Sequence, residues 1–172
     1  MVDALTDVLK ELLRSDRLII VGIGNILRGD DGIGVVIARK LRRLFKGLRS
    51  IKVIICEAGL ENVTHLLMRY RPKHLLIIDA VYVKGGTPGD IYVFGVDELD
   101  SYRSITTHHL PLKLTLDYLM TNLNINVSII GIQVKNTELG SGISEEVLYA
   151  GKCVFYAFKE LSRHVMKERP PR

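Results

Sequence analysis

The hydrophobic residues of this chain fall into two alternating patterns. Short continuous apolar runs over residues 18–21, 51–56, 74–78, 91–94 and 126–132 predict strands. Apolar residues at helical spacing over residues 4–14, 31–46, 61–70, 112–119 and 144–161 predict amphipathic helices. Strands and helices that alternate in this way favour βαβ crossovers, and continuous apolar strands are typical of sheets covered on both faces. We therefore expect an α/β fold: a single three-layer domain with a twisted, mostly parallel sheet of about five strands, an antiparallel edge strand at 91–94 and helices on both faces.

Local signals refine the helix starts and the two ends of the chain. A leading helix within residues 1–16 precedes the first strand, and two prolines close to the end predict a frayed tail over residues 167–172. Pro111 suits the first turn of a helix, where a missing N–H costs little. Ser144 is a favourable N-cap, and Glu145 and Glu146 after it complement the helix dipole. We expect residues 1–172 to form one domain.

Composition narrows the classes of function. The chain has 172 residues, of which 47% are hydrophobic and 25% charged, as in an ordinary globular protein. The formal net charge of +5 comes from scattered lysines and arginines without an RNA-binding aromatic motif, so we expect no binding to nucleic acid. No apolar run is long enough to span a bilayer and no signal peptide is evident, which predicts a cytoplasmic protein without membrane insertion. Cys56 and Cys153 lie far apart and imply no disulfide framework.

Three groups of polar residues stand where a site is expected in an open α/β sheet, beyond the carboxyl ends of strands. The adjacent Asp30 and Asp31 follow the first strand, within the segment VGIGNILRGDDGIG at 21–34, and Asp79 follows the third strand. If the first strand lies between the second and third, these carboxylates converge. His108 and His109 precede a later helix. Two carboxylates and one imidazole suit a borderline divalent metal such as nickel or zinc, with coordination positions left open for chemistry.

Each of these residues also has a structural interpretation. One of the two adjacent aspartates could cap the following helix, Asp79 could bind backbone N–H groups of the next loop, and either histidine could simply begin a helix. Asn25 is expected to fix its loop through hydrogen bonds to the backbone. The glycines at 22 and 24 invite a dinucleotide-binding interpretation, but position 27 lacks the third glycine and two acids stand where a pyrophosphate would bind. We therefore disfavour a nucleotide-dependent enzyme.

Four segments in the same order resemble one known family. GIGNILRGDDGIG resembles the first signature of the nickel–iron hydrogenase maturation endopeptidases, LLIIDA their second ligand strand and ITTHHLPL their third ligand loop. GIQVKNTELGSGISEEV is similar to the C-terminal motif of the branch that serves formate-hydrogenlyase-type and other membrane-bound hydrogenases. The resemblance covers about residues 18–161.

The resemblance implies a nickel-dependent endopeptidase. Such an enzyme removes the C-terminal extension of a hydrogenase large-subunit precursor after nickel insertion. By motif position, the ligands and catalytic residues are Asp31, Asp79 and His108, with nickel either resident or supplied by the precursor, and other divalent metals able to substitute. His109 occupies a position that is often not histidine in the family.

The remaining expectations concern the loop around the first ligand, the partner and the alternative function. Substrate-binding and loop roles are expected for Gly24, Asn25, Asp30, Gly32 and His109, with Asp30 as the helix cap and Gly32 bringing backbone close to the peptide. The expected partner is the large-subunit precursor, and the resemblance implies a monomer. The alternative function is a non-proteolytic metal-binding or chaperone module of hydrogenase maturation.

Overall fold

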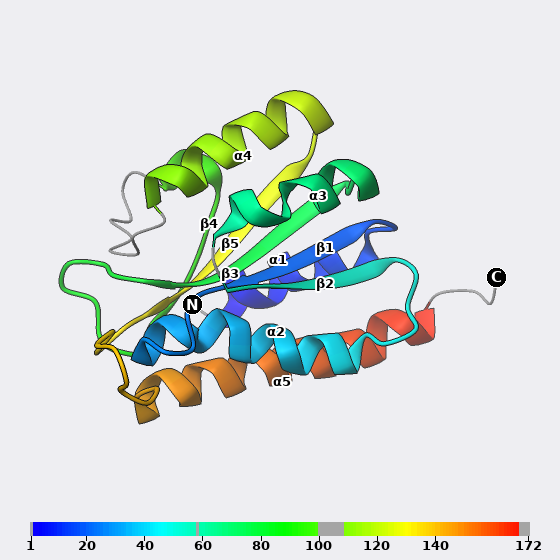
Figure 1. Cartoon of the computed structure of the whole chain (residues 1–172). Coiled ribbons are helices and arrows are strands. Elements are labelled where there is room, and N and C mark those ends of the chain that lie inside the picture. The colour runs from blue at the N-terminus through cyan, green and yellow to red at the C-terminus, as the bar shows by residue number, and fades with distance from the viewer. Residues whose placement is uncertain (1, 58, 100–108, 169–172) are drawn as a thin grey trace.

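Five strands form one sheet in the order β2-β1-β3-β5-β4 (Figure 1). A computed structural model of the chain describes residues 2–57, 59–99 and 109–168. The strands are β1 (Leu18–Ile23), β2 (Ile51–Cys56), β3 (His74–Val81), β4 (Ile91–Phe94) and β5 (Asn126–Gln133). β1 pairs in parallel with β2 and β3, β3 pairs in parallel with β5, and β4 runs antiparallel to β5 at the edge. This topology confirms the expected mostly parallel sheet with an antiparallel edge strand.

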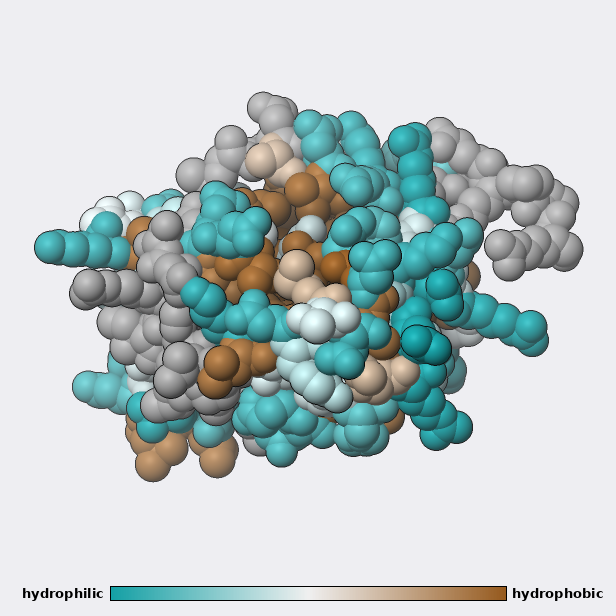
Figure 2. Space-filling view, turned by 90° about the horizontal axis from the view of Figure 1, so that it is seen from above, coloured by the Kyte–Doolittle hydropathy of each residue, from teal (hydrophilic) through white to brown (hydrophobic). Residues whose placement is uncertain are grey.

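Helices cover both faces of the sheet, as expected (Figure 1). They are α1 (Val2–Arg14), α2 (Ile33–Leu44), α3 (Thr64–Tyr70), α4 (His109–Leu123) and α5 (Glu145–Glu168), with short 3₁₀ turns at Gly29–Gly32, Leu60–Val63 and Val96–Glu98. α1, α2 and α5 pack on one face, and α3 and α4 on the other. Seen onto the α3 and α4 face, hydrophobic residues gather toward the middle and hydrophilic residues surround them (Figure 2).

Alternating side chains of the strands divide the core into two layers. Leu18, Ile20, Leu76 and Ile78 point to the side of α1, α2 and α5, while their neighbours along the same strands point to the side of α3 and α4. All four are essentially buried. This two-sided burial explains why the strands are continuous apolar runs without an alternating pattern.

Glycines allow α2 to approach the sheet closely. A β-carbon on Gly34 would overlap the backbone carbonyl oxygens of Ile23 in β1 and Ile78 in β3. A β-carbon on Gly22 would overlap the carbonyl oxygen of Gly34 in turn. The helix that follows the first loop is therefore held directly against the two strands whose ends carry the candidate acids.

Tertiary pairing moves several element boundaries away from the sequence expectations. β3 continues to Val81 because its last residues pair with β5, so Asp79 lies inside this strand, opposite Gly131, and not after it. Asp31 lies in a 3₁₀ turn that precedes α2, whereas the sequence pattern predicted that the helix itself began there. α5 continues through residues 167 and 168, which were expected in the frayed tail, and residues 169–172 lie outside the described part of the chain.

None of the helices in the described part of the chain combines the length and apolar character that a membrane span requires.

Candidate functional site

The strand order places the candidate site where the chain changes direction across the sheet. β1 lies between β2 and β3, so the loops that follow β1 and β3 open at the same edge. Asp30 and Asp31 lie in the first of these loops, and Asp79 lies close to the end of β3. The condition that the sequence left open, β1 between the second and third strands, is therefore met.

The loop after β1 folds back on itself and holds the Asp31 carboxylate. The backbone N–H of Asn25 donates to Oδ2 of Asp31 at 2.8 Å, and the Asn25 side chain accepts from the N–H of Leu27 at 2.9 Å. Gly24 has a φ of +141° and lies so close to the chain that a β-carbon there would overlap the Asp31 carbonyl oxygen. The loop-fixing role expected of Asn25 is confirmed, and Asp31 is oriented by its own loop.

Asp30 is completely buried and binds a different part of the chain. Its carboxylate accepts from the backbone N–H groups of Lys135 at 2.7 Å, Asn136 at 2.9 Å and Ser144 at 2.6 Å, and from the Ser144 hydroxyl at 3.0 Å. The expectation that Asp30 caps the following helix is wrong, because α2 has no side-chain cap. Asp30 instead joins the loop after β5 and the start of α5 to the loop after β1.

Ser144 directly precedes α5, which is the position expected of an N-cap residue. Its carbonyl oxygen accepts from the N–H of Leu148 at 2.9 Å, which is the first helical hydrogen bond. The Asp30 carboxylate accepts from the N–H of Ser144, so a residue 114 positions earlier in the sequence adds to the negative charge that Glu145 and Glu146 place in the first turn of α5.

Asp79 is the most strongly perturbed ionisable group of the site. It is 2% exposed, between β1 and β5, and its Oδ1 accepts from the N–H of Ala80 at 2.8 Å. The pKa of Asp79 is raised from 3.8 to about 7: burial is the largest cause, repulsion from the Asp31 carboxylate adds to it, and the Ala80 hydrogen bond opposes both. The two expected acidic ligands are therefore close enough to repel each other, and the pair favours a bound proton or cation.

Asp31 and Asp79 have the donor chemistry of a divalent-cation site but supply only part of one. Two carboxylates that repel each other in a buried setting are stabilised by a cation, and carboxylate oxygens are suitable ligands for divalent metals. Within residues 2–57, 59–99 and 109–168, no three His, Cys, Asp or Glu side chains gather as a metal site. His108 lies outside the described residues, and His109 is the first residue of α4.

The sequence analysis missed one buried polar residue at this edge of the sheet. Gln133 ends β5 and is 2% exposed. Its Oε1 accepts from the N–H of Val83 at 2.8 Å, and its Nε2 donates to the carbonyl oxygen of Val134 at 3.4 Å. Gln133 therefore fixes the loop that leaves β3. The sequence does contain a sign of this role: Gln133 is the only strongly polar side chain among the last five residues of an otherwise apolar strand.

Comparisons with known proteins agree with one another on a family. The HycI family, described as hydrogenase maturation protease, matches residues 35–157, which is more than half of the chain. A Methanocaldococcus jannaschii protein that is provisionally named a hydrogenase maturation protease is 36% identical over 149 residues, 83% of this chain and 86% of that protein. The hydrogenase 3 maturation protease of Escherichia coli K12 is 33% identical over 115 residues, 67% of this chain and 71% of that protein.

A solved structure shares the fold as well. The crystal structure of the HycI nickel–iron hydrogenase maturation protease from Thermococcus kodakarensis superposes with a TM-score of 0.78 at 26% identity. The match covers 91% of this chain and 99% of that chain. The three-layer arrangement derived above is therefore that of a known peptidase.

Proposed function

The chain belongs to the hydrogenase maturation protease family and is a peptidase, and we propose that it removes the C-terminal extension of a nickel–iron hydrogenase large-subunit precursor after nickel insertion. We further propose that this cleavage depends on nickel. The observation that supports the proposal is the pair of buried carboxylates at the switch point of the sheet, Asp31 and Asp79, whose mutual repulsion favours a cation.

In this proposal Asp31, Asp79 and His108 hold the nickel ion, which either resides in the enzyme or arrives in the precursor. When bound, such an ion can polarise the scissile carbonyl group and activate a water molecule. The hydrogen bond from the N–H of Asn25 to Oδ2 of Asp31 orients this carboxylate within the loop after β1. The cation also removes the electrostatic cost of placing two carboxylates side by side.

The chain's own groups contribute orientation and proton handling. With its pKa raised to about 7, Asp79 holds a proton up to about neutral pH in the metal-free enzyme. A cation would have to displace this proton in order to bind the Asp79 carboxylate. Asp30 is a positioning residue: its hydrogen bonds join the loop that carries Asp31 to the loop after β5 and to the residue before α5.

The proposal also states which of the two adjacent histidines is the third ligand. The motif register assigns the ligand to His108, while His109 is the first residue of α4. We expect His108→Ala to abolish processing and His109→Ala to retain it. If the two outcomes were reversed, the third ligand would be His109.

Nickel dependence is tested with two forms of one substrate. The enzyme, first stripped of metal with a chelator, is incubated with nickel-loaded large-subunit precursor and, separately, with precursor prepared without nickel, and the intact mass of the large subunit is followed. We expect shortening of the loaded precursor alone. Shortening of both forms would contradict nickel dependence and leave the peptidase assignment intact.

A different outcome would support the non-proteolytic alternative. A chaperone module would co-purify with the precursor while the mass of the large subunit stays unchanged in both forms. The cytoplasmic, monomeric state and the absence of nucleic-acid binding stay predictions of the sequence; gel filtration of the purified enzyme tests the monomer.

A further inference from the structure

β2 is an edge strand of the sheet, and its open edge faces away from β1. It pairs with β1 on one side, and among the described strands it has no partner on the other. An open edge offers backbone N–H and C=O groups that an extended peptide can bind. The side chains of Val53, Ile54 and Ile55 are only half-buried, so the strand itself is accessible.

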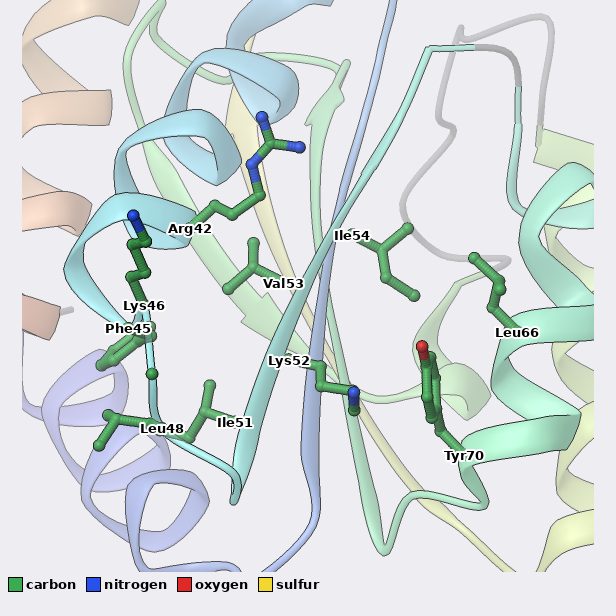
Figure 3. A pocket seen from close by; sticks show the side chains of 11 residues that line it. Arg42, Phe45, Lys46, Leu48, Ile51, Lys52, Val53, Ile54, Leu66 and Tyr70 are labelled. Atoms are coloured by element: carbon green, nitrogen blue, oxygen red, sulfur yellow. The ribbon is translucent and has the colours of Figure 1, made fainter.

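Two helices flank this edge and turn it into a groove (Figure 3). The groove has a volume of about 360 Å³. The end of α2 and the turn after it form one wall, with Arg42, Lys46 and Leu48, and α3 forms the other, with Leu66 and Tyr70. Val53 points from β2 toward the first wall, and Ile54 toward the second (Figure 3). A strand laid along β2 would therefore place its alternate side chains against different walls.

The charges that line the groove have one sign. Arg42, Lys46 and Lys52 are exposed, and none of the described residues that line the groove is acidic. The ion pairs found between described residues involve other cations, and the nearest along α2 joins Arg39 to Glu57 at 2.7 Å. Lys52 Nζ lies 3.9 Å from the centre of the Tyr70 ring, so this cation lies against the second wall of the groove (Figure 3).

We propose that this groove is a docking site for an extended, acidic segment of a partner protein, which binds by adding a strand to the edge of β2. Acidic side chains of the segment face Arg42 and Lys46 at the first wall, and aliphatic side chains face Ile54 and Leu66 at the second. The expected segment thus alternates acidic and branched aliphatic residues. This site adjoins the amino end of β2 and is separate from the acids at the carboxyl ends of β1 and β3, so it does not rest on the proposed function.

Charge also argues against a second copy of this chain as the occupant. Two β2 edges that paired with each other would bring Lys52 and its neighbouring cations into a common interface, and like charges in one interface are unfavourable. A nucleic acid or lipid surface would use the cations but not the open backbone edge or the apolar floor between the walls. An acidic extended peptide uses all three features.

The test measures binding of a synthetic peptide to the full chain. The probe is a fluorescently labelled hexapeptide of alternating Glu and Val, acetylated and amidated at its ends, and the control replaces Glu with Lys. We expect fluorescence anisotropy to show saturable binding of the acidic peptide, at least about tenfold tighter than the basic one. Equal affinity for the two peptides would overturn the proposal.

Variants of the protein locate the binding. The double substitution Arg42→Glu with Lys46→Glu should weaken acidic-peptide binding about tenfold or more, because it replaces attraction with repulsion. Lys10→Glu is the control, since Lys10 is exposed on α1 and does not line the groove, and it should leave binding unchanged. Circular dichroism of both variants tests that each is folded. Equal loss in both variants would show non-specific attraction and would contradict the proposal.

Backbone methylation distinguishes strand addition from simple charge attraction. In an added strand, alternate residues direct their N–H groups at the neighbouring strand. Peptides N-methylated at all Glu or at all Val amides should therefore differ: one set should lose binding at least about tenfold and the other should retain it. Equal binding by both sets would refute strand addition. Binding of the protein to anionic phospholipid vesicles, lost in the double variant while the peptide never binds, would assign the groove to a membrane surface instead.

Discussion

Replacing Asp79 with Asn should stabilise the metal-free protein at alkaline pH. The carboxyl group is 2% exposed and lies beside the Asp31 carboxylate, so its charged form is costly in the folded state. Its pKa is 3.8 in the unfolded chain and about 7 in the folded one, and the difference of about 3 multiplied by about 1.36 kcal/mol gives about 4 kcal/mol. Asn has no charge, accepts the Ala80 N–H in the same way and can donate to Asp31.

The sign of the pH dependence follows from proton binding. Between pH 4 and 7 the folded protein holds a proton on Asp79 that the unfolded chain has released. The stability contributed by this protonated group is therefore complete below about pH 4 and is lost as the pH rises through about 7. The free energy of unfolding of Asp79→Asn, minus that of the wild type, should rise across this interval and level off above about pH 8, at up to about 4 kcal/mol.

Urea unfolding followed by circular dichroism, in chelator and at several pH values from 4.5 to 9, measures this difference. Comparison of the two proteins at each pH cancels the contributions of titrating groups that do not interact with Asp79. Asp31→Asn provides a second arm, because removing the repulsion should make the pH dependence of wild-type stability shallower while burial maintains part of it. A difference that stays constant with pH, or one that falls toward pH 9, would refute the reasoning.

The remaining predictions concern the packing that supports the site. Asp30→Ala should lower the free energy of unfolding by about 3–5 kcal/mol, because it leaves buried N–H groups without acceptors. Ser144→Ala removes only the hydrogen bond from the Ser144 hydroxyl and should lower it by about 1 kcal/mol. Similar losses for the two variants in urea unfolding would show that Asp30 does not join the two loops. Gly34→Ala should cost about 3 kcal/mol or more, because the added methyl group overlaps backbone oxygens of β1 and β3. Gly142→Ala meets open space and should change the thermal midpoint little, so equal shifts in the two variants would contradict the packing argument.

The sequence predicted the layers because these depend on local hydrophobic spacing, and it predicted the mostly parallel strand directions because strands alternate with helices that can form crossovers. Both faces of β1 and β3 are buried, and the continuous apolar runs show this without any knowledge of the partners. The convergence of Asp31 and Asp79 was conditional on strand order, which hydrophobic spacing does not encode. The sequence placed Asp79 just after the third strand, but pairing with β5 extends β3 past Asp79 to Val81, so the end of this strand was predicted only to within about two residues.

Long-range hydrogen bonds account for what the sequence could not predict. Asp30 finds its partners more than 100 residues later in the chain, and no local pattern distinguishes such an acid from a helix cap. Gln133 likewise binds Val83 across 50 positions. The close contacts at Gly24 and Gly32 are made with the chain's own loop, and their expected role in substrate binding stays a prediction.

Processing of nickel-loaded precursor by aspartate variants is the most direct test of the account. Asp31→Asn and Asp79→Asn remove one charge each from the proposed site, while Asp90→Asn changes an aspartate that accepts a hydrogen bond within the turn before β4. The rate of large-subunit shortening is measured by intact mass for each variant and the wild type. We predict a loss of at least about 100-fold for Asp31→Asn and for Asp79→Asn, with a near-normal rate for Asp90→Asn. Normal processing by either of the first two variants would contradict the claim that these paired carboxylates form the active site.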